Sequence, residues 1–210
     1  PEEAVVKKAI LSLAVALWCS GLALSQPQTR IKLLPDEERY FTVGLMGGFY
    51  FLQDRVFQDL YGKGAPFFGA EMTLRFPIRE PHGMDIAAGG RTLTKKGLTS
   101  YTEEALRLRL TDLSLSLRYS YDTGRFALFL GPGIEYVTYR ETYAESFPID
   151  STQGSQTGLH LTGGGYVHLT SALSLKAYIK YCRVETDKPG FRINLGGTEW
   201  GVGILYRFYF

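Results

Sequence analysis

Charged residues of both signs recur at alternate positions, within segments whose intervening residues are mostly apolar. Glu135 stands between an isoleucine and a tyrosine, and so does Lys180. The residues placed in this way are Glu71, Asp85, Asp112, Glu135 and Glu199, together with Arg75, Arg91, Arg107, Arg109, Arg118, Lys176, Lys180 and Arg207. Charges that face one another in a poorly hydrated interior are costly unless they pair. The sequence therefore predicts ion pairs between these groups.

Such a network supports two kinds of function. Fixed pairs would plug the interior and serve a structural role. Alternatively, Glu135 with Arg118, or Glu199 with a neighbouring Lys or Arg, could exchange partners and gate a narrow ion path. Because basic groups outnumber acidic groups in this set, such a path would weakly favour anions.

The alternation that places these charges runs through eight segments, which predicts strands. They cover residues 40–52, 66–77, 83–93, 105–121, 126–139, 158–169, 172–184 and 194–210. The connections alternate between long (53–65, 94–104, 140–157, 185–193) and short (78–82, 122–125, 170–171). This order predicts an all-β, eight-stranded, antiparallel up-and-down barrel, with the long loops at one end and the short turns at the other.

The final segment indicates which face of the barrel points outward. One face of this segment carries only apolar and aromatic residues, namely Trp200, Val202, Ile204, Tyr206, Phe208 and Phe210. The interior of an eight-stranded barrel is just wide enough for its own side chains, so the apolar bulk of all eight segments cannot point inward. We therefore expect a transmembrane barrel whose apolar face contacts lipid, with many of the 24 glycines beside the charges on the other face.

Two irregularities interrupt the alternation. Leu106, Leu108 and Leu110 occupy even positions, whereas the leucines that follow from Leu113 occupy odd positions. A β-bulge near residues 111–112 would keep both sets facing lipid. Pro132 removes a ladder hydrogen bond and predicts a local distortion.

The start of the sequence has the features of a secretory signal peptide. Lys7 and Lys8 precede an apolar run, and Ala23-Leu24-Ser25 supplies the small residues of a cleavage site. The run is short and interrupted for a membrane-spanning helix. We assign residues 1–25 to the signal and its upstream residues, 26–39 to a periplasmic N-terminal segment and 40–210 to the barrel.

Three stretches carry a family resemblance: FTVGLMGGFYF at 41–51, LFLGPGIEYV at 128–137 and EWGVGILYRFYF at 199–210. With them the chain resembles the small eight-stranded outer-membrane β-barrels, the opacity proteins and the transmembrane domain of outer-membrane protein A. The resemblance implies a monomer in the bacterial outer membrane, in contact with lipid and lipopolysaccharide. It also implies short periplasmic turns, long extracellular loops, and insertion machinery that reads the terminal aromatics Tyr206, Phe208 and Phe210.

Similar barrels serve different functions, so the function must be inferred from particular residues and not from the fold. Tyr143, Phe147 and Phe191 in the long loops are candidates for binding a host or matrix ligand, as in an adhesin. Lipid-modifying barrel enzymes are a weaker alternative, since His160 and His168 have no serine and acid at a recognisable spacing. No metal, cofactor or nucleic-acid motif is present, and the net charge is only +2.

Overall fold

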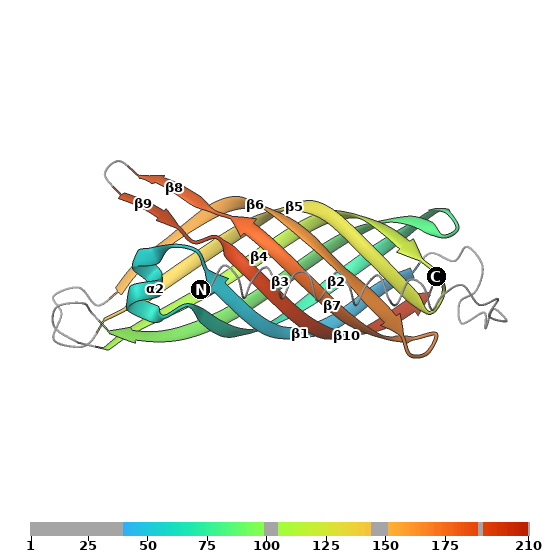
Figure 1. The fold of residues 1–210 in the computed structure, drawn as a ribbon, viewed down its shortest axis with the longest axis horizontal. Helices are drawn as coiled ribbons and strands as arrows, with labels where there is room; N and C mark the ends of the chain where they lie inside the picture. The colour runs from blue at the N-terminus through green and yellow to red at the C-terminus, as the bar shows by residue number, and fades with distance from the viewer. Residues whose placement is uncertain (1–39, 99–104, 144–150, 189–190, 210) are drawn as a thin grey trace, which may run out of the picture. The chain divides into compact units, whose positions relative to one another are not determined.

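The computed structural model describes residues 40–98, 105–143, 151–188 and 191–209. Eight antiparallel strands close into a barrel in the order β1-β10-β7-β6-β5-β4-β3-β2 (Figure 1). The barrel strands are β1 (Tyr40–Leu52), β2 (Gly64–Arg79), β3 (His82–Leu98), β4 (Ala105–Asp122), β5 (Phe126–Thr142), β6 (Ser151–His168), β7 (Leu173–Arg183) and β10 (Gly197–Tyr209). A short helix, α2 (Arg55–Tyr61), follows β1, and a hairpin of β8 (Glu185–Lys188) and β9 (Phe191–Asn194) follows β7. The predicted fold class is confirmed.

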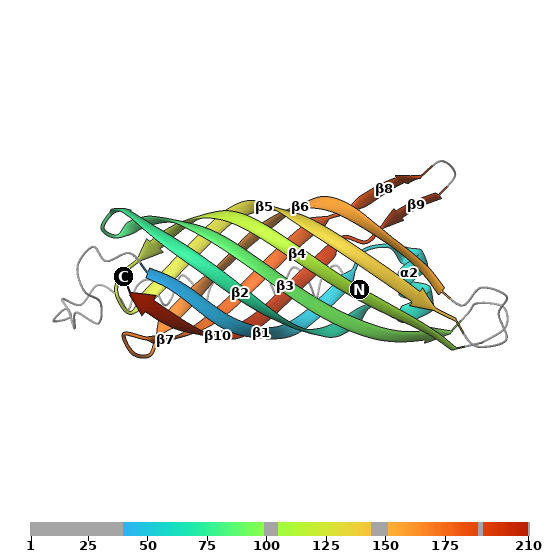
Figure 2. The same cartoon turned by 180° about the vertical axis from the view of Figure 1, so that it is seen from behind.

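The two ends of the barrel differ, as the rear view shows (Figure 2). At one end, here called the loop end, lie α2, the β8–β9 hairpin, the last residues of β3 and β5 and the first residues of β4 and β6. At the other end, the turn end, short connections join β2 to β3, β4 to β5 and β6 to β7. Within the described chain, no helix is long and apolar enough to cross a membrane.

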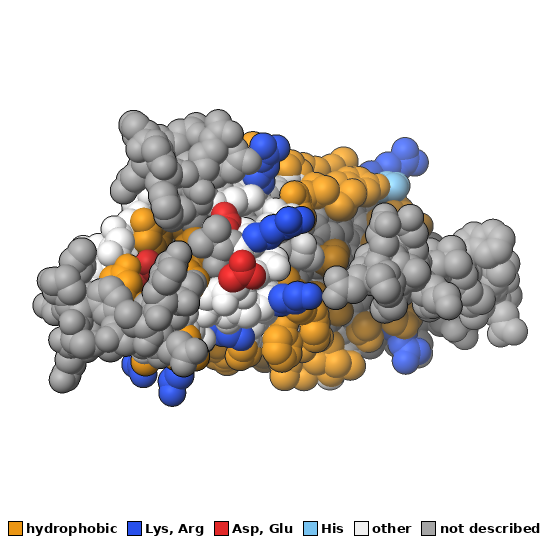
Figure 3. Space-filling model, turned by 60° about the vertical axis from the view of Figure 1, so that its left-hand side comes forward, with side chains coloured by type: hydrophobic (Ala, Val, Ile, Leu, Met, Phe, Trp, Pro, Cys, Tyr) orange, Lys and Arg blue, Asp and Glu red, His pale blue; other side chains and the backbone are white. Residues whose placement is uncertain are grey.

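Large apolar side chains cover the outside of the barrel, where they form a wide hydrophobic band (Figure 3). We call this band the apolar belt; its most exposed members include Leu45, Phe68, Leu113, Leu159 and Val202, each at least 59% exposed. A water-soluble surface rarely exposes a contiguous apolar area of this size, whereas a barrel wall in lipid requires one.

The barrel closes between β1 and β10 through a register that matches aromatic side chains. Phe41 stands opposite Phe208 and their rings stack with centroids 4.7 Å apart. Farther along the same seam, Phe49 stacks on Trp200 at 5.3 Å. The alternating aromatic pattern of the last strand therefore serves closure as well as contact with lipid.

Several strands are longer at the loop end than the alternation predicted. β3 continues to Leu98, and β6 begins at Ser151, inside a segment predicted as a loop. Residues 152–156 of β6 are polar or glycine, so they carry no hydrophobic period, yet their backbone groups pair with β5. Alternation of apolar and polar residues therefore reveals only the part of a strand that has one apolar face.

The predicted β-bulge in β4 is wrong. The β3–β4 register runs without a shift from Leu98 opposite Ala105 to His82 opposite Tyr121. Leu106, Leu108 and Leu110 therefore point into the barrel and are at most 5% exposed. The apolar residues switch from odd to even positions because the side chains that fill the interior change along the barrel. They are charged in the middle of the barrel and apolar near the loop end.

Pro132 does distort the sheet locally. The β4–β5 pairing stops between Ser116 opposite Gly133 and Tyr119 opposite Leu130, then resumes in the same register. Beside it the strands come so close that a Cβ at Gly131 would overlap the Leu117 carbonyl oxygen.

Gly131→Ala should therefore destabilise the barrel by about 1–3 kcal/mol, since the backbone atoms that meet the new methyl group cannot rotate away. The matched control is Gly47→Ala, because a Cβ there would lie 3.6 Å from the Phe67 carbonyl oxygen, an ordinary contact. Urea unfolding in lipid vesicles, followed by the unboiled-versus-boiled gel shift, measures both variants. Equal stability of the two variants would contradict the close approach at Gly131.

Candidate functional site

The candidate site is the charged interior of the barrel. Six acidic groups, Glu71, Asp85, Asp112, Asp122, Glu135 and Glu199, share it with six basic groups, Arg75, Arg91, Arg118, Lys176, Lys180 and Arg207. We call this set the interior network. It contains Asp122, which the sequence assigned to a turn, and its two signs balance.

Arg107 and Arg109 were predicted to lie inside, and this is wrong. Both side chains are exposed on the outer face of β4, because the strand keeps one phase throughout its length. Without these two arginines, and with Asp122 counted inside, the basic excess disappears, and with it the reason for expecting the interior to favour anions.

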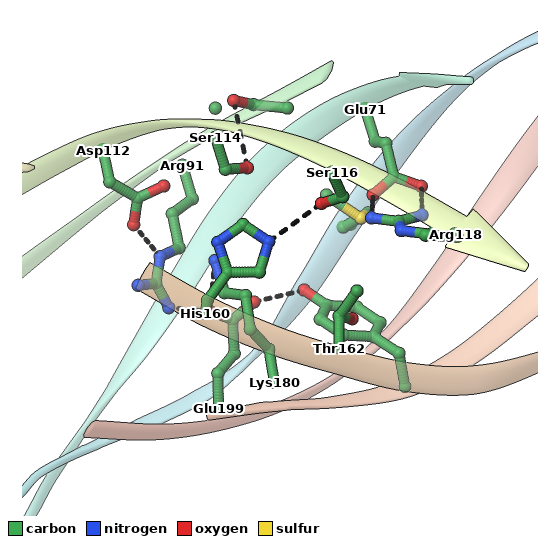
Figure 4. Close-up of a pocket in the computed structure, with 14 residues that line it drawn as sticks. Glu71, Arg91, Asp112, Ser114, Ser116, Arg118, His160, Thr162, Lys180 and Glu199 are labelled. Carbon is green, nitrogen blue, oxygen red and sulfur yellow. Dashed lines mark hydrogen bonds and ion pairs between the residues drawn. The ribbon is translucent and has the colours of Figure 1, made fainter. Parts of the chain in front are cut away.

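Arg91 lies at the centre of the network and contacts carboxylates from three other strands. Figure 4 shows Arg91 with Asp112 and Glu199, two of these three. Its guanidinium donates to Asp112 of β4, Glu199 of β10 and, at 3.1 Å, Glu135 of β5. The same guanidinium lies 4.2 Å from the centre of the Tyr50 ring. A planar group with several fixed donors is suited to joining three carboxylates in this way.

Lys180 joins two of these carboxylates a second time. Its Nζ lies 2.7 Å from Glu135 and 3.3 Å from Glu199. Tyr178 donates a hydrogen bond of 2.5 Å to the other oxygen of Glu199. Glu199 therefore has a cation or a donor on both of its oxygens.

A second cluster forms around Glu71 of β2. Arg118 donates to both carboxylate oxygens at 3.0 and 2.7 Å, and Lys176 donates at 2.5 Å. Arg118 therefore pairs with Glu71 and not with Glu135, the partner proposed from the sequence. β2, β4 and β7 are not neighbours in the barrel, so these three side chains meet across its interior. Their meeting depends on the register of all the strands between them.

The third cluster lies toward the turn end. Arg75 contacts Asp122 at 3.3 Å, and His168 lies 3.4 Å from the same carboxylate. Arg207 approaches His168 Nδ1 at 2.8 Å, and Ser120 donates to Asp85 at 3.0 Å. His168 therefore contacts Asp122 and Arg207, two members of the interior network, on the inner wall of the barrel.

Above the charges, the loop end is filled by apolar side chains. Phe57 and Tyr61 of α2 belong to one buried cluster with Leu93, Leu106 and Leu108, and we call these five residues the apolar plug. The helix lies so close to β3 that a Cβ at Gly97 would overlap the Leu60 carbonyl oxygen.

The hydroxyl of Tyr61 anchors α2 to the opposite wall. It donates a 2.7 Å hydrogen bond to Glu141 of β5. Burial and this hydrogen bond raise the pKa of Tyr61 well above its usual value. The Tyr61 hydroxyl therefore keeps the proton that it donates to Glu141 at physiological pH.

Ser116, His160 and Glu135 form an arrangement that the sequence did not reveal. Ser116 Oγ lies 2.8 Å from His160 Nε2, and His160 Nδ1 lies 4.0 Å from Glu135 Oε2. These residues come from three strands, so no spacing along the chain could have indicated them. Their order matches a nucleophile, a base and an acid.

This arrangement has no space for a substrate. All three side chains are buried, and the cavity beside them has a volume of about 20 Å³, enough for one water molecule. Across the described part of the chain, no group of three or more His, Cys, Asp or Glu side chains could hold a metal ion.

The loop residues proposed for binding are only partly described. Tyr143 is partly buried against the core cluster, and its hydroxyl donates to Glu141 at 3.2 Å. Phe147 and the side chain of Phe191 lie outside the described residues. Tyr206 and Phe208 point outward from β10 into the apolar belt, while Phe210 is outside the described range.

Arg91→Gln should lower the free energy of unfolding by about 3–5 kcal/mol, because three buried carboxylates lose their shared cation. Arg125→Gln removes an exposed arginine at the turn end and should change it by less than about 0.5 kcal/mol. Adding Glu199→Gln to Arg91→Gln restores the charge balance and should recover part of the loss, which a double-mutant cycle in urea measures. If Arg91→Gln and Arg125→Gln lowered the free energy of unfolding equally, the central role of Arg91 would be refuted.

Comparisons with known proteins show which kind of barrel this is. No curated protein sequence matches the chain. Neisserial surface protein A aligns with 80% of this chain and 97% of its own, at 13% identity and a TM-score of 0.58. OprG from Pseudomonas aeruginosa aligns with 82% of this chain and 97% of its own, at 12% identity and a TM-score of 0.54. Ail of Yersinia pestis, in complex with the heparin analogue sucrose octasulfate, aligns with 81% of this chain and 98% of its own, at 13% identity and a TM-score of 0.52.

At these identities the three structures establish a shared fold. A family model described as the outer membrane protein beta-barrel domain matches residues 14–208, which is most of the sequence. The loop end is therefore the extracellular end, and the turn end faces the periplasm. The chain belongs to the outer membrane protein beta-barrel domain family and is a protein of the bacterial outer membrane.

Proposed function

We propose that this protein is a sealed, non-catalytic barrel that holds its extracellular elements rigid for interaction at the cell surface. The observation that carries the proposal is the filled interior, where a charge-balanced network lies beneath the apolar plug. An interior filled with side chains, in which most charges are paired, serves as a support for the elements above it.

Ion permeation through this interior would require the network to open. Arg91 and Lys180 between them hold Glu135 and Glu199 from two strands, so moving one pair leaves another charge without its partner. Breaking one partner out of a buried ion pair costs about 3–5 kcal/mol. Beyond the network, an ion would also meet the apolar plug, whose one polar group, the Tyr61 hydroxyl, is already bonded to Glu141.

The protein extracted from outer membranes should therefore produce no discrete current steps in a planar bilayer. Replacing residues 55–61 with a Gly-Ser segment of equal length should leave it silent, because the interior network still closes the barrel. A 16-stranded porin serves as the positive control for the bilayer. Regular, discrete steps from the unaltered protein would refute the sealed interior and favour the gated-channel alternative.

The extracellular elements support a role in surface interaction. α2 is held against the barrel by Gly97 and Glu141, and the β8–β9 hairpin extends the wall beyond the ring (Figure 1). Loops supported by a rigid scaffold are common sites of recognition. Immobilised heparin is a suitable first probe, since Ail, which shares this fold, was solved with a heparin analogue.

If the loops bind, replacing residues 144–150 with a Gly-Ser segment of equal length should reduce adhesion of expressing cells to heparin-coated or matrix-coated surfaces at least several-fold. Arg79→Gln, on the periplasmic side, is the control and should leave adhesion unchanged. Cell-surface labelling must show equal amounts of folded protein for each variant. Undiminished adhesion after the loop replacement would contradict a binding role for this loop.

A further inference from the structure

We propose that the outer wall of β3, β4 and β5 binds the phosphate groups of a phosphorylated glycolipid in the outer leaflet, through Lys96, Arg107, Arg109 and Arg140. We call these four residues the basic patch. The proposal does not depend on whether the loops bind a ligand, because the patch lies on the barrel wall.

The strand register brings the four side chains of the basic patch together. Lys96 of β3 stands opposite Arg107 of β4, and Arg109 of β4 stands opposite Arg140 of β5. Directly opposed side chains on one face of an antiparallel pair have Cβ atoms about 5 Å apart. The two pairs are neighbouring rows of one face, so four cations share a small area of the wall.

This grouping is unfavourable without an anion. Like charges directly opposite each other destabilise a strand pair. None of the four side chains forms an ion pair with an acidic residue in the part of the chain that the structure describes. Glu141, the neighbour of Arg140, faces the interior and accepts a hydrogen bond from Tyr61. An external anion would therefore remove a repulsion that the fold leaves in place.

The patch lies at the level where lipid headgroups begin. Leu113 and Tyr136 form the last row of large apolar side chains that faces outward on both β4 and β5. The next row holds Thr111 and Thr138, and the row after it holds Arg109 and Arg140. Four residues of a strand span about 13 Å, which the tilt of the strands reduces to about 10 Å along the membrane normal.

A lipid fits this position better than a soluble anion does. Acyl chains would lie on the apolar belt directly below, and the phosphate groups would then meet guanidinium groups that can bind them through two hydrogen bonds each. The threonine row between them offers hydroxyls suited to a sugar headgroup, and Thr92 and Thr111 already lie within 3.3 Å of each other.

The test uses the full-length protein in detergent, titrated with diphosphorylated lipid A and followed by native mass spectrometry. Arg109→Gln/Arg140→Gln should weaken lipid A binding by about tenfold or more, since each basic group near an anionic lipid surface contributes about 1 kcal/mol. The matched control, Arg79→Gln/Arg125→Gln, removes two exposed charges at the turn end and should change binding by less than about twofold.

Two further measurements separate the lipid from its phosphate. Enzymatically dephosphorylated lipid A should bind the unaltered protein as weakly as lipid A binds the patch variant. Inorganic phosphate at the same concentration should not displace lipid A. Equal weakening by both double variants, full binding of dephosphorylated lipid A, or complete displacement by phosphate would each overturn the proposal. The gel shift on boiling verifies that every variant is folded.

Discussion

The cost of burying charge inside a narrow barrel is the constraint on which the rest of this structure depends. Twelve ionisable groups lie in the interior network, six of each sign, and Arg91 alone joins carboxylates from three strands. Each ion pair crosses from strand to strand, so the network fixes the register of the barrel as well as neutralising it.

The change from charged to apolar contents along the barrel explains the arrangement above the membrane. Once the strands pass the apolar belt, their outer face meets water and headgroups, and their inner face can bury apolar residues. Leu106 and Leu108 therefore point inward while Arg107 and Arg109 point outward, with no bulge in β4. The helix α2 then completes the apolar plug.

The two faces of the wall suggest two separate roles. The filled interior supports the proposed role in surface interaction, because a filled barrel gives loops and the β8–β9 hairpin a rigid base. The basic patch suggests how the same wall would be anchored at a fixed depth in the outer leaflet. A barrel held in this way would present its extracellular elements at a constant height above the membrane.

The sequence alone predicted the strand count, the up-and-down order and most of the lipid-facing residues, because a period of two is a local property of each strand. It wrongly placed Leu106, Leu108 and Leu110 on the lipid face. It also predicted that Glu71, Glu135 and Glu199 lie inside. It could not identify their partners, or bring Ser116 to His160, because cross-strand register is not written in any single segment. The interior or exterior position of Arg107 and Arg109 was likewise decided by the tertiary structure. In this part of β4 the alternation is compatible with either set of residues facing inward. Which set is buried depends on the side chains that fill the barrel near the loop end.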